Sequence, residues 1–198
     1  MITIINSIED ALEKECYLPA LALALTIPDI CGEAAYPDLV DGKGRRLVGE
    51  QYRTWFDDWA SKYFADHTGY SEDYKKAKNP YFTKVMCYEL RCAYLHNGKT
   101  IIPNFGVNTD DEWDYLYSFE LCINGLDMFG ETWGSHSHNN NKKVKEIHVR
   151  VNIQKLCESL CLAAREYFKS NEGFGFENTR ISVRDIEKEY EFINKTNS

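Results

Sequence analysis

The sequence predicts an α+β fold that is predominantly helical, with a small antiparallel sheet inserted into or appended to a helical bundle. Apolar residues recur at helical spacing before residue 98 and again after residue 152. Between these two parts, short apolar runs favour extended structure. The chain has 198 residues, of which 43% are hydrophobic, so it is long enough to bury a core. We therefore expect helices at both ends of the chain and strands between them.

These patterns divide one predicted domain, 1–198, into four parts. Residues 1–98 form the helical part, and residues 99–153 form the strand-rich part. Residues 154–170 form a packing helix, and the charged residues 171–198 form a tail. We find no internal repeat that would indicate a second domain.

The first helix is expected from about Ile8 to Leu25. Ser7 is followed three residues later by Asp10, a pattern typical of a capped helix start. Pro28 disfavours helical geometry at the residue before it and is expected to end this helix. The stretch 29–49 contains four glycines and a proline and is predicted to be a loop.

Two further helices are expected before residue 98. Aromatic residues recur at helical spacing through 50–64, and we interpret them as core residues rather than a surface for stacking on bases. After the polar, turn-rich stretch 67–79, a third helix is expected from about Tyr81 to His96. Asn97-Gly98 should end it, because both residues tolerate the left-handed conformation.

Three stretches favour strands: 100–103, 115–123 and 146–153. In the last of these, apolar and polar residues alternate, which is typical of a half-buried strand. The polar stretch 134–141 is expected to be a loop. Asn152 is placed to cap the final helix.

The composition limits the classes of function. The formal charge is −8, which counts against tight, nonspecific RNA binding but leaves room for a small enzyme site. The basic runs 43–46, 75–78 and 142–145 are interpreted as solvated surface. Seven scattered cysteines without a CxxC pair indicate free thiols in a reducing compartment. The longest apolar run, 18–27, is short for a membrane span, so we expect a cytoplasmic protein with no membrane partner.

The candidate site residues are Arg91 and His96, at the end of the third predicted helix. A guanidinium group can hold phosphate oxygens, and an imidazole exchanges protons near neutral pH. In RNA cleavage, His96 would remove the 2′-hydroxyl proton or protonate the leaving 5′ oxygen. Arg91 would stabilise the charge on the phosphorane. The helix dipole favours the cationic form of His96.

Five positions of an ideal helix separate two residues by about 140°, so one regular helix presents this pair poorly. Either the last helical turn unwinds, or the site is assembled from two helices, as a homodimer allows. The structural alternative is that both side chains cap the helix end, or that Arg91 pairs with an acid such as Glu89.

The segment from Leu90 to Gly98 resembles the Arg-x4-His signature of HEPN-domain proteins, which are helical, usually dimeric and often metal-independent ribonucleases. Many of them are bacterial toxins of toxin–antitoxin or abortive-infection systems. The resemblance carries catalytic roles onto Arg91 and His96 alone. The sequence departs from the family pattern at Cys92, where HEPN nucleases frequently carry a polar Asn, Asp or His, and in the strand-rich stretch.

The resemblance implies a metal-independent RNA endonuclease, a toxin or phage-defence component, that uses the pair across a homodimer. RNA would be its substrate, an antitoxin or regulatory protein its possible partner, and no cofactor or metal is expected. The alternative is a catalytically inactive HEPN-like module that binds a partner protein or a nucleotide.

Secondary site candidates are Asp29 and Asn97. Asp29 could line the same cleft and orient Arg91 or His96, although turn formation is the commoner role for Asp after Pro. His136 and His138 could offer two metal ligands, but a polar loop is the preferred interpretation.

Overall fold

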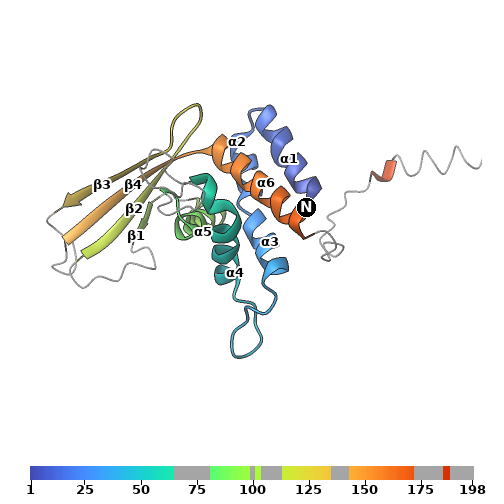
Figure 1. Cartoon of the computed structure of the whole chain (residues 1–198). Coiled ribbons are helices and arrows are strands. Elements are labelled where there is room, and N and C mark those ends of the chain that lie inside the picture. The colour runs from blue at the N-terminus through green and yellow to red at the C-terminus, as the bar shows by residue number, and fades with distance from the viewer. Residues whose placement is uncertain (65–80, 99–100, 104–112, 135–142, 172–184, 188–198) are drawn as a thin grey trace, which may run out of the picture.

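The computed structural model describes residues 1–64, 81–98, 101–103, 113–134, 143–171 and 185–187, and the statements below concern these residues. The described part is mostly helical, with a small sheet that extends from one side of the helices (Figure 1). This confirms the predicted helix-rich α+β class. The predicted turn at 67–79, the predicted loop at 134–141 except Gly134, and nearly all of the tail lie outside the described residues. Gly134 is the last residue of a strand rather than part of a loop.

The first predicted helix, 8–25, is two shorter helices, α1 (Ile2–Glu13) and α2 (Tyr17–Ala24). A third helix, α3 (Ile27–Ala35), follows where a loop was predicted. The chain turns between α1 and α2, where Glu15 has a φ of 58°. Pro28 lies in the first turn of α3, where the missing proline N–H costs no helical hydrogen bond. The prediction that Pro28 ends a helix was therefore wrong, and the predicted loop from residue 29 begins as a helix.

The α2–α3 stretch, Tyr17–Ala35, is long and apolar enough to cross a membrane by length and composition. Here it bends between the two helices, where Leu25 and Thr26 are turn residues. Its side chains also contribute to the core of the helical part, which includes fully buried Leu21, Leu25 and Ile27. This burial is what a core helix of a globular fold shows.

Helix α4 (Val48–Trp55) continues through a π-helical turn (Phe56–Ala60) and a 3-10 turn (Ser61–Phe64). Tyr52, Trp55 and Phe56 are fully buried. The predicted aromatic helix over 50–64, and its interpretation as core, are confirmed.

Helix α5 (Lys84–Cys92) is capped by Thr83, whose side chain accepts a hydrogen bond from the backbone N–H of Met86. A π-helical turn (Ala93–Asn97) follows, and Gly98 ends it with a φ of 59°. The third predicted helix and its Asn-Gly stop are thus confirmed, with a start three residues later than expected.

The sheet has four strands in the order β1-β2-β4-β3: β1 (Ile101–Pro103), β2 (Trp113–Cys122), β3 (Met128–Gly134) and β4 (Lys143–Asn152). The outer pairs, β1–β2 and β3–β4, are antiparallel, but the central pair β2–β4 is parallel over ten residues. The prediction of an antiparallel sheet was wrong for this central pair.

The parallel pair arises because β4 is inserted between β2 and β3. After β2, residues 123–127 lead across the end of β4 to β3, which runs back antiparallel to β4. The sequence did not predict β3 because Gly130 and Gly134 weaken the strand pattern. Without β3, the neighbours and direction of β4 could not be derived.

Helix α6 (Ile153–Ser170) runs through the middle of the helical part and packs against α1, α2 and α3 (Figure 1). Asn152 caps it as predicted: its side chain accepts from the backbone N–H of Lys155 at 3.0 Å and donates to Gly125 O at 2.7 Å. The backbone N–H of Asn152 also donates to Asp127 Oδ1 at 2.6 Å. These bonds fix the end of the sheet to the start of α6.

Candidate functional site

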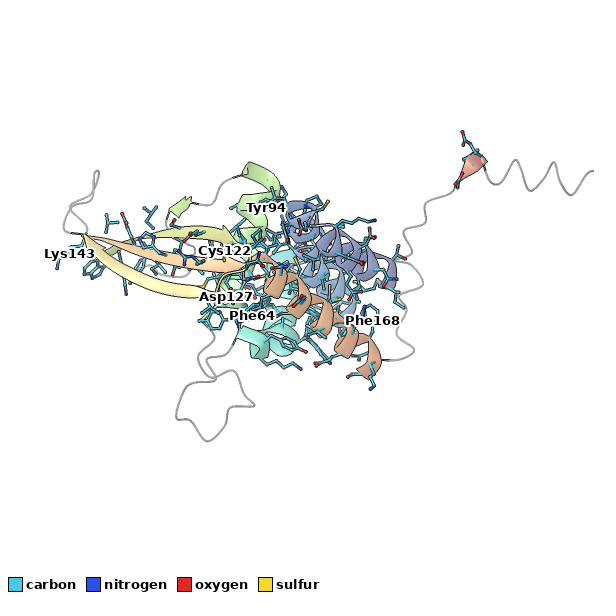
Figure 2. The ribbon with its side chains drawn as sticks, turned by 90° about the horizontal axis from the view of Figure 1, so that it is seen from above. Phe64, Tyr94, Cys122, Asp127, Lys143 and Phe168 are labelled. Atoms are coloured by element: carbon cyan, nitrogen blue, oxygen red, sulfur yellow. The ribbon has the colours of Figure 1, made fainter. Side chains whose placement is uncertain are left out.

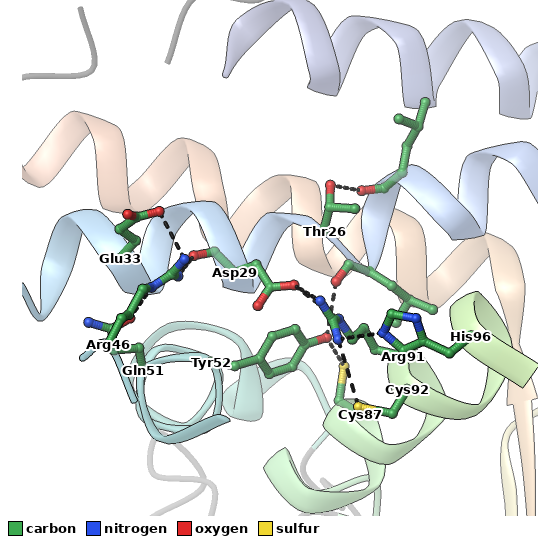
Figure 3. A network of polar contacts seen from close by, with 12 residues as sticks. Thr26, Asp29, Glu33, Arg46, Gln51, Tyr52, Cys87, Arg91, Cys92 and His96 are labelled. Carbon is green, nitrogen blue, oxygen red and sulfur yellow. Dashed lines mark hydrogen bonds and ion pairs between the residues drawn. The ribbon is translucent and has the colours of Figure 1, made fainter. Parts of the chain in front are cut away.

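Arg91 and His96 lie in contact at the end of α5. Arg91 Nη1 is 3.2 Å from His96 Nε2 (Figure 3). The contact forms because residues 93–97 make a π-helical turn, which widens the helix and brings residues five apart onto one side. Of the two arrangements left open by the sequence, the structure has the altered last turn, within one chain. A second copy is not needed to bring these two side chains together.

The contact has one direction as a hydrogen bond. A guanidinium group has no acceptor, so Arg91 Nη1 is the donor and His96 Nε2 the acceptor. His96 is exposed, so solvent reaches the pair from its side.

Asp29 holds Arg91 from the opposite side (Figure 3). Asp29 Oδ2 accepts from Arg91 Nε at 3.0 Å and pairs with Nη2 at 2.8 Å. The two side chains are only 15% and 19% exposed, so solvent screens this ion pair weakly. Asp29 thus lies next to Arg91, one of the two residues that it was expected to orient.

Close packing of α3 on α4 helps to place Asp29. Gly32 lies one turn after Asp29, and a Cβ atom there would be 2.6 Å from the carbonyl oxygen of Gln51. Only glycine allows the two backbones to approach this closely.

The electrostatics of the pair reflect its burial. Burial raises the pKa of the Asp29 carboxyl group, while the positive charge of Arg91 acts in the opposite direction. Burial is the largest single effect and disfavours the charge on Arg91, but Asp29 and Cys92 together outweigh it and raise the pKa of the guanidinium. Asp29 Oδ1 is buried and has no hydrogen-bond partner among the described residues. The carboxyl group therefore has one buried oxygen atom that can still accept a hydrogen bond.

Cys92 and a buried tyrosine complete the surroundings of Arg91. Cys92 Sγ lies 3.8 Å from Arg91 Nη1, as a weak acceptor. Below them, the hydroxyl of Tyr52 lies 3.3 Å from both Leu25 O and Cys87 Sγ. Burial raises the pKa of Cys87 to about 12, so this thiol stays protonated and packs as a small core residue.

Arg46 belongs to this network, although the sequence analysis placed it in a solvated basic run. Its Nη2 donates to Asp29 O at 2.6 Å, and its Nη1 pairs with Glu33 at 3.0 Å. Its Nε donates to the side chain of buried Gln51. No sequence signal linked Arg46 to Asp29, since the contact joins a loop to a helix 17 residues away.

The other candidates fall outside this network or outside the description. Asn97 ends the π-helical turn, but its side chain lies outside the described residues, as do His136 and His138. In the described ranges, no group of three or more His, Cys, Asp or Glu side chains is arranged to hold a metal ion. Glu89, the structural alternative as a partner of Arg91, is half-buried, and Arg91 pairs with Asp29 instead.

Comparisons of the chain with models of known protein families, with curated protein sequences and with solved structures found no match.

Proposed function

We propose that this protein is a metal-independent RNA endonuclease of the HEPN type, in which Arg91 and His96 act on one phosphate. The observation that carries the proposal is the 3.2 Å contact between Arg91 Nη1 and His96 Nε2 at a helix end that solvent reaches. A guanidinium group and an imidazole side by side are the two groups that cleavage through the 2′-hydroxyl needs.

The reaction follows from the chemistry of these two groups. His96 takes the proton of a 2′-hydroxyl, and the hydroxyl oxygen attacks the adjacent phosphorus. The bond from phosphorus to the 5′ oxygen then breaks, that oxygen takes up a proton from water, and His96 returns its proton to solvent, which reaches the pair from its side. Arg91 donates to the phosphate oxygens as negative charge builds on them. Asp29 binds Nε and Nη2 of Arg91, so it directs Nη1 toward His96 and acts as a positioning residue.

The biological setting belongs to the same proposal. We place the enzyme in the cytoplasm as a toxin or phage-defence component, as a homodimer restrained by an antitoxin or regulatory protein. A homodimer would set two Arg91–His96 pairs near one another, although each pair is already formed within one chain. Light scattering measures this directly, and a monomeric mass would remove the dimer from the proposal.

A second candidate is a catalytically inactive HEPN-like module that binds a partner protein or a nucleotide. The observation that favours it is the Asp29–Arg91 ion pair, because a carboxylate on the guanidinium competes with a phosphate. Cys92, in place of the polar residue frequent after the arginine of HEPN nucleases, favours the same candidate.

One assay separates the two candidates. Wild-type protein is incubated with tRNA or total RNA in EDTA, beside Arg91→Ala and His96→Ala. Arg150→Ala and His148→Ala are matched controls. They remove an arginine and a histidine of β4 that do not take part in the Arg91–His96 contact. We expect the wild type and both controls to cut, and both site variants to lose most activity. Intact RNA with the wild type, or equal cutting by the site variants, would refute the proposal.

A further inference from the structure

The far end of the sheet carries lysines on aromatic rings. The parallel register places Lys143 of β4 beside Trp113 of β2, and Lys145 beside Tyr115. Lys143 Nζ lies 5.3 Å from the centroid of the Trp113 ring, and Lys145 Nζ lies 5.8 Å from that of Tyr115. Alternate residues of a strand point to the same side, so both pairs share one face of the sheet. We call these four residues the Lys–aromatic face.

The same side of the sheet is core nearer the helices. Tyr117, Phe119, Ile147 and Val149 continue the two rows and are at most 5% exposed. Toward the far end the side chains become half-buried, and Lys143 is exposed. Figure 2 places Lys143 at the end of the sheet that points away from the helices, with Cys122 at the helical end. The two strands thus run on beyond the core, where Trp113, Tyr115 and Lys145 are half-buried and Lys143 is exposed.

This combination has a defined binding chemistry. Proteins that bind single-stranded nucleic acid join cationic groups for the phosphates to aromatic rings for the bases. Sheets that bind RNA use aromatic residues on neighbouring positions of their strands to stack successive bases. The two rings of the Lys–aromatic face lie on alternate residues of β2, about 7 Å apart along the strand. The chain has a formal charge of −8, so a phosphate chain is attracted to local lysines rather than to the whole surface.

We propose that the Lys–aromatic face binds single-stranded nucleic acid, with Trp113 and Tyr115 stacking on bases and Lys143 and Lys145 contacting phosphates. The sequence analysis interpreted these lysines as solvated surface. The proposal goes beyond RNA cleavage and does not depend on it, since neither residue of the Arg91–His96 pair takes part. If both proposals hold, this face contributes to substrate binding apart from the reacting groups.

The test uses a probe that the enzyme cannot cut. A fluorescein-labelled oligodeoxythymidylate of about twelve nucleotides is long enough for such a face and has no 2′-hydroxyl. Fluorescence anisotropy measures its binding to the full chain at several salt concentrations. The test variant is Lys143→Glu with Lys145→Glu. The control is Lys14→Glu with Lys169→Glu, which changes the net charge equally at two exposed positions, one just after α1 and one in α6.

We expect the wild type, the control and Arg91→Ala to bind alike, and the test variant to bind more weakly. Loss of two phosphate contacts should reduce the slope of log K against log salt by about 1.4. Trp113→Ala should weaken binding at least about fivefold, since one base loses its stacking partner. Trp113→Phe keeps a ring and should restore most of the affinity, which separates stacking from a folding defect.

Three results would overturn the proposal: no binding by the wild type, equal weakening by the test and control variants, or normal binding by Trp113→Ala. Each leaves RNA cleavage by the Arg91–His96 pair untouched. Conversely, a protein that binds the probe through this face but never cuts RNA refutes the cleavage proposal alone.

Discussion

Replacement of Gly32 by alanine should destabilise the fold, because Gly32 lies where α3 meets α4. The added Cβ would be 2.6 Å from Gln51 O and 2.8 Å from Gln51 C, where ordinary contact begins at 3.4 Å. The obstacle is backbone, so one helix has to move by most of an ångström. Overpacking of this kind costs about 3 kcal/mol at the upper end of its usual range. The higher helix propensity of alanine returns about 1 kcal/mol, which leaves a net loss of about 2 kcal/mol.

Urea unfolding followed by circular dichroism measures this loss. Gly42→Ala is the matched control, because a Cβ there meets no atom within 4 Å and its φ is not in the left-handed region. We expect Gly42→Ala to unfold like the wild type. If Gly32→Ala proved as stable as the control, the close approach of α3 and α4 that places Asp29 beside Arg91 would be wrong.

Three further changes test other parts of the structure. Asn152→Ala removes the cap of α6 and the bond to Gly125 O, so the free energy of unfolding should fall by about 1–2 kcal/mol in urea titrations; an unchanged midpoint would contradict that role. Gly98→Ala places a side chain at a φ of 59°, so thermal unfolding should show a loss of about 1 kcal/mol in the free energy of unfolding. No loss would contradict the left-handed conformation of Gly98 at the end of the π-helical turn. Burial raises the pKa of Asp29 above 3.8, so the folded chain binds more protons than the unfolded chain in the pH range just above that value. The free energy of unfolding of the wild type should therefore fall relative to that of Asp29→Asn as pH rises through this range. A difference between the two proteins that is constant with pH would contradict a raised pKa of Asp29.

Local signals in the sequence predicted much of the fold. The Asn-Gly stop, the Asn152 cap and the aromatic helix are each encoded within a few residues, so neighbouring side chains and backbone preferences suffice to place them. Local signals also gave the wrong role for Pro28, which was predicted to end a helix. A proline just after one helix and a proline in the first turn of the next helix cannot be distinguished by neighbouring residues alone. The direction of β4 depends on its pairing with β3, and β3 was not predicted because its glycines weaken the strand pattern.

The candidate site was predictable only in part. Arg91 and His96 stood out by type and spacing, but the sequence left open whether the last turn unwinds or two helices supply the pair, because π-helical turns leave no signal in a short sequence. The turn at 93–97 changes the geometry from two separated faces to a direct contact. The contacts of Asp29 with Arg91 and Arg46 join residues 62 and 17 positions apart, so only the packing of α3 reveals them.

The central claim is that Arg91 and His96 cleave RNA through its 2′-hydroxyl. The most direct measurement is the chemistry of the ends that wild-type protein leaves on a defined RNA in EDTA. We expect a 2′,3′-cyclic phosphate on one fragment and a 5′-hydroxyl on the other, and no cut where the 2′-hydroxyl is replaced by hydrogen. Cleavage that survives this replacement, or that requires a divalent metal ion, would contradict the claim.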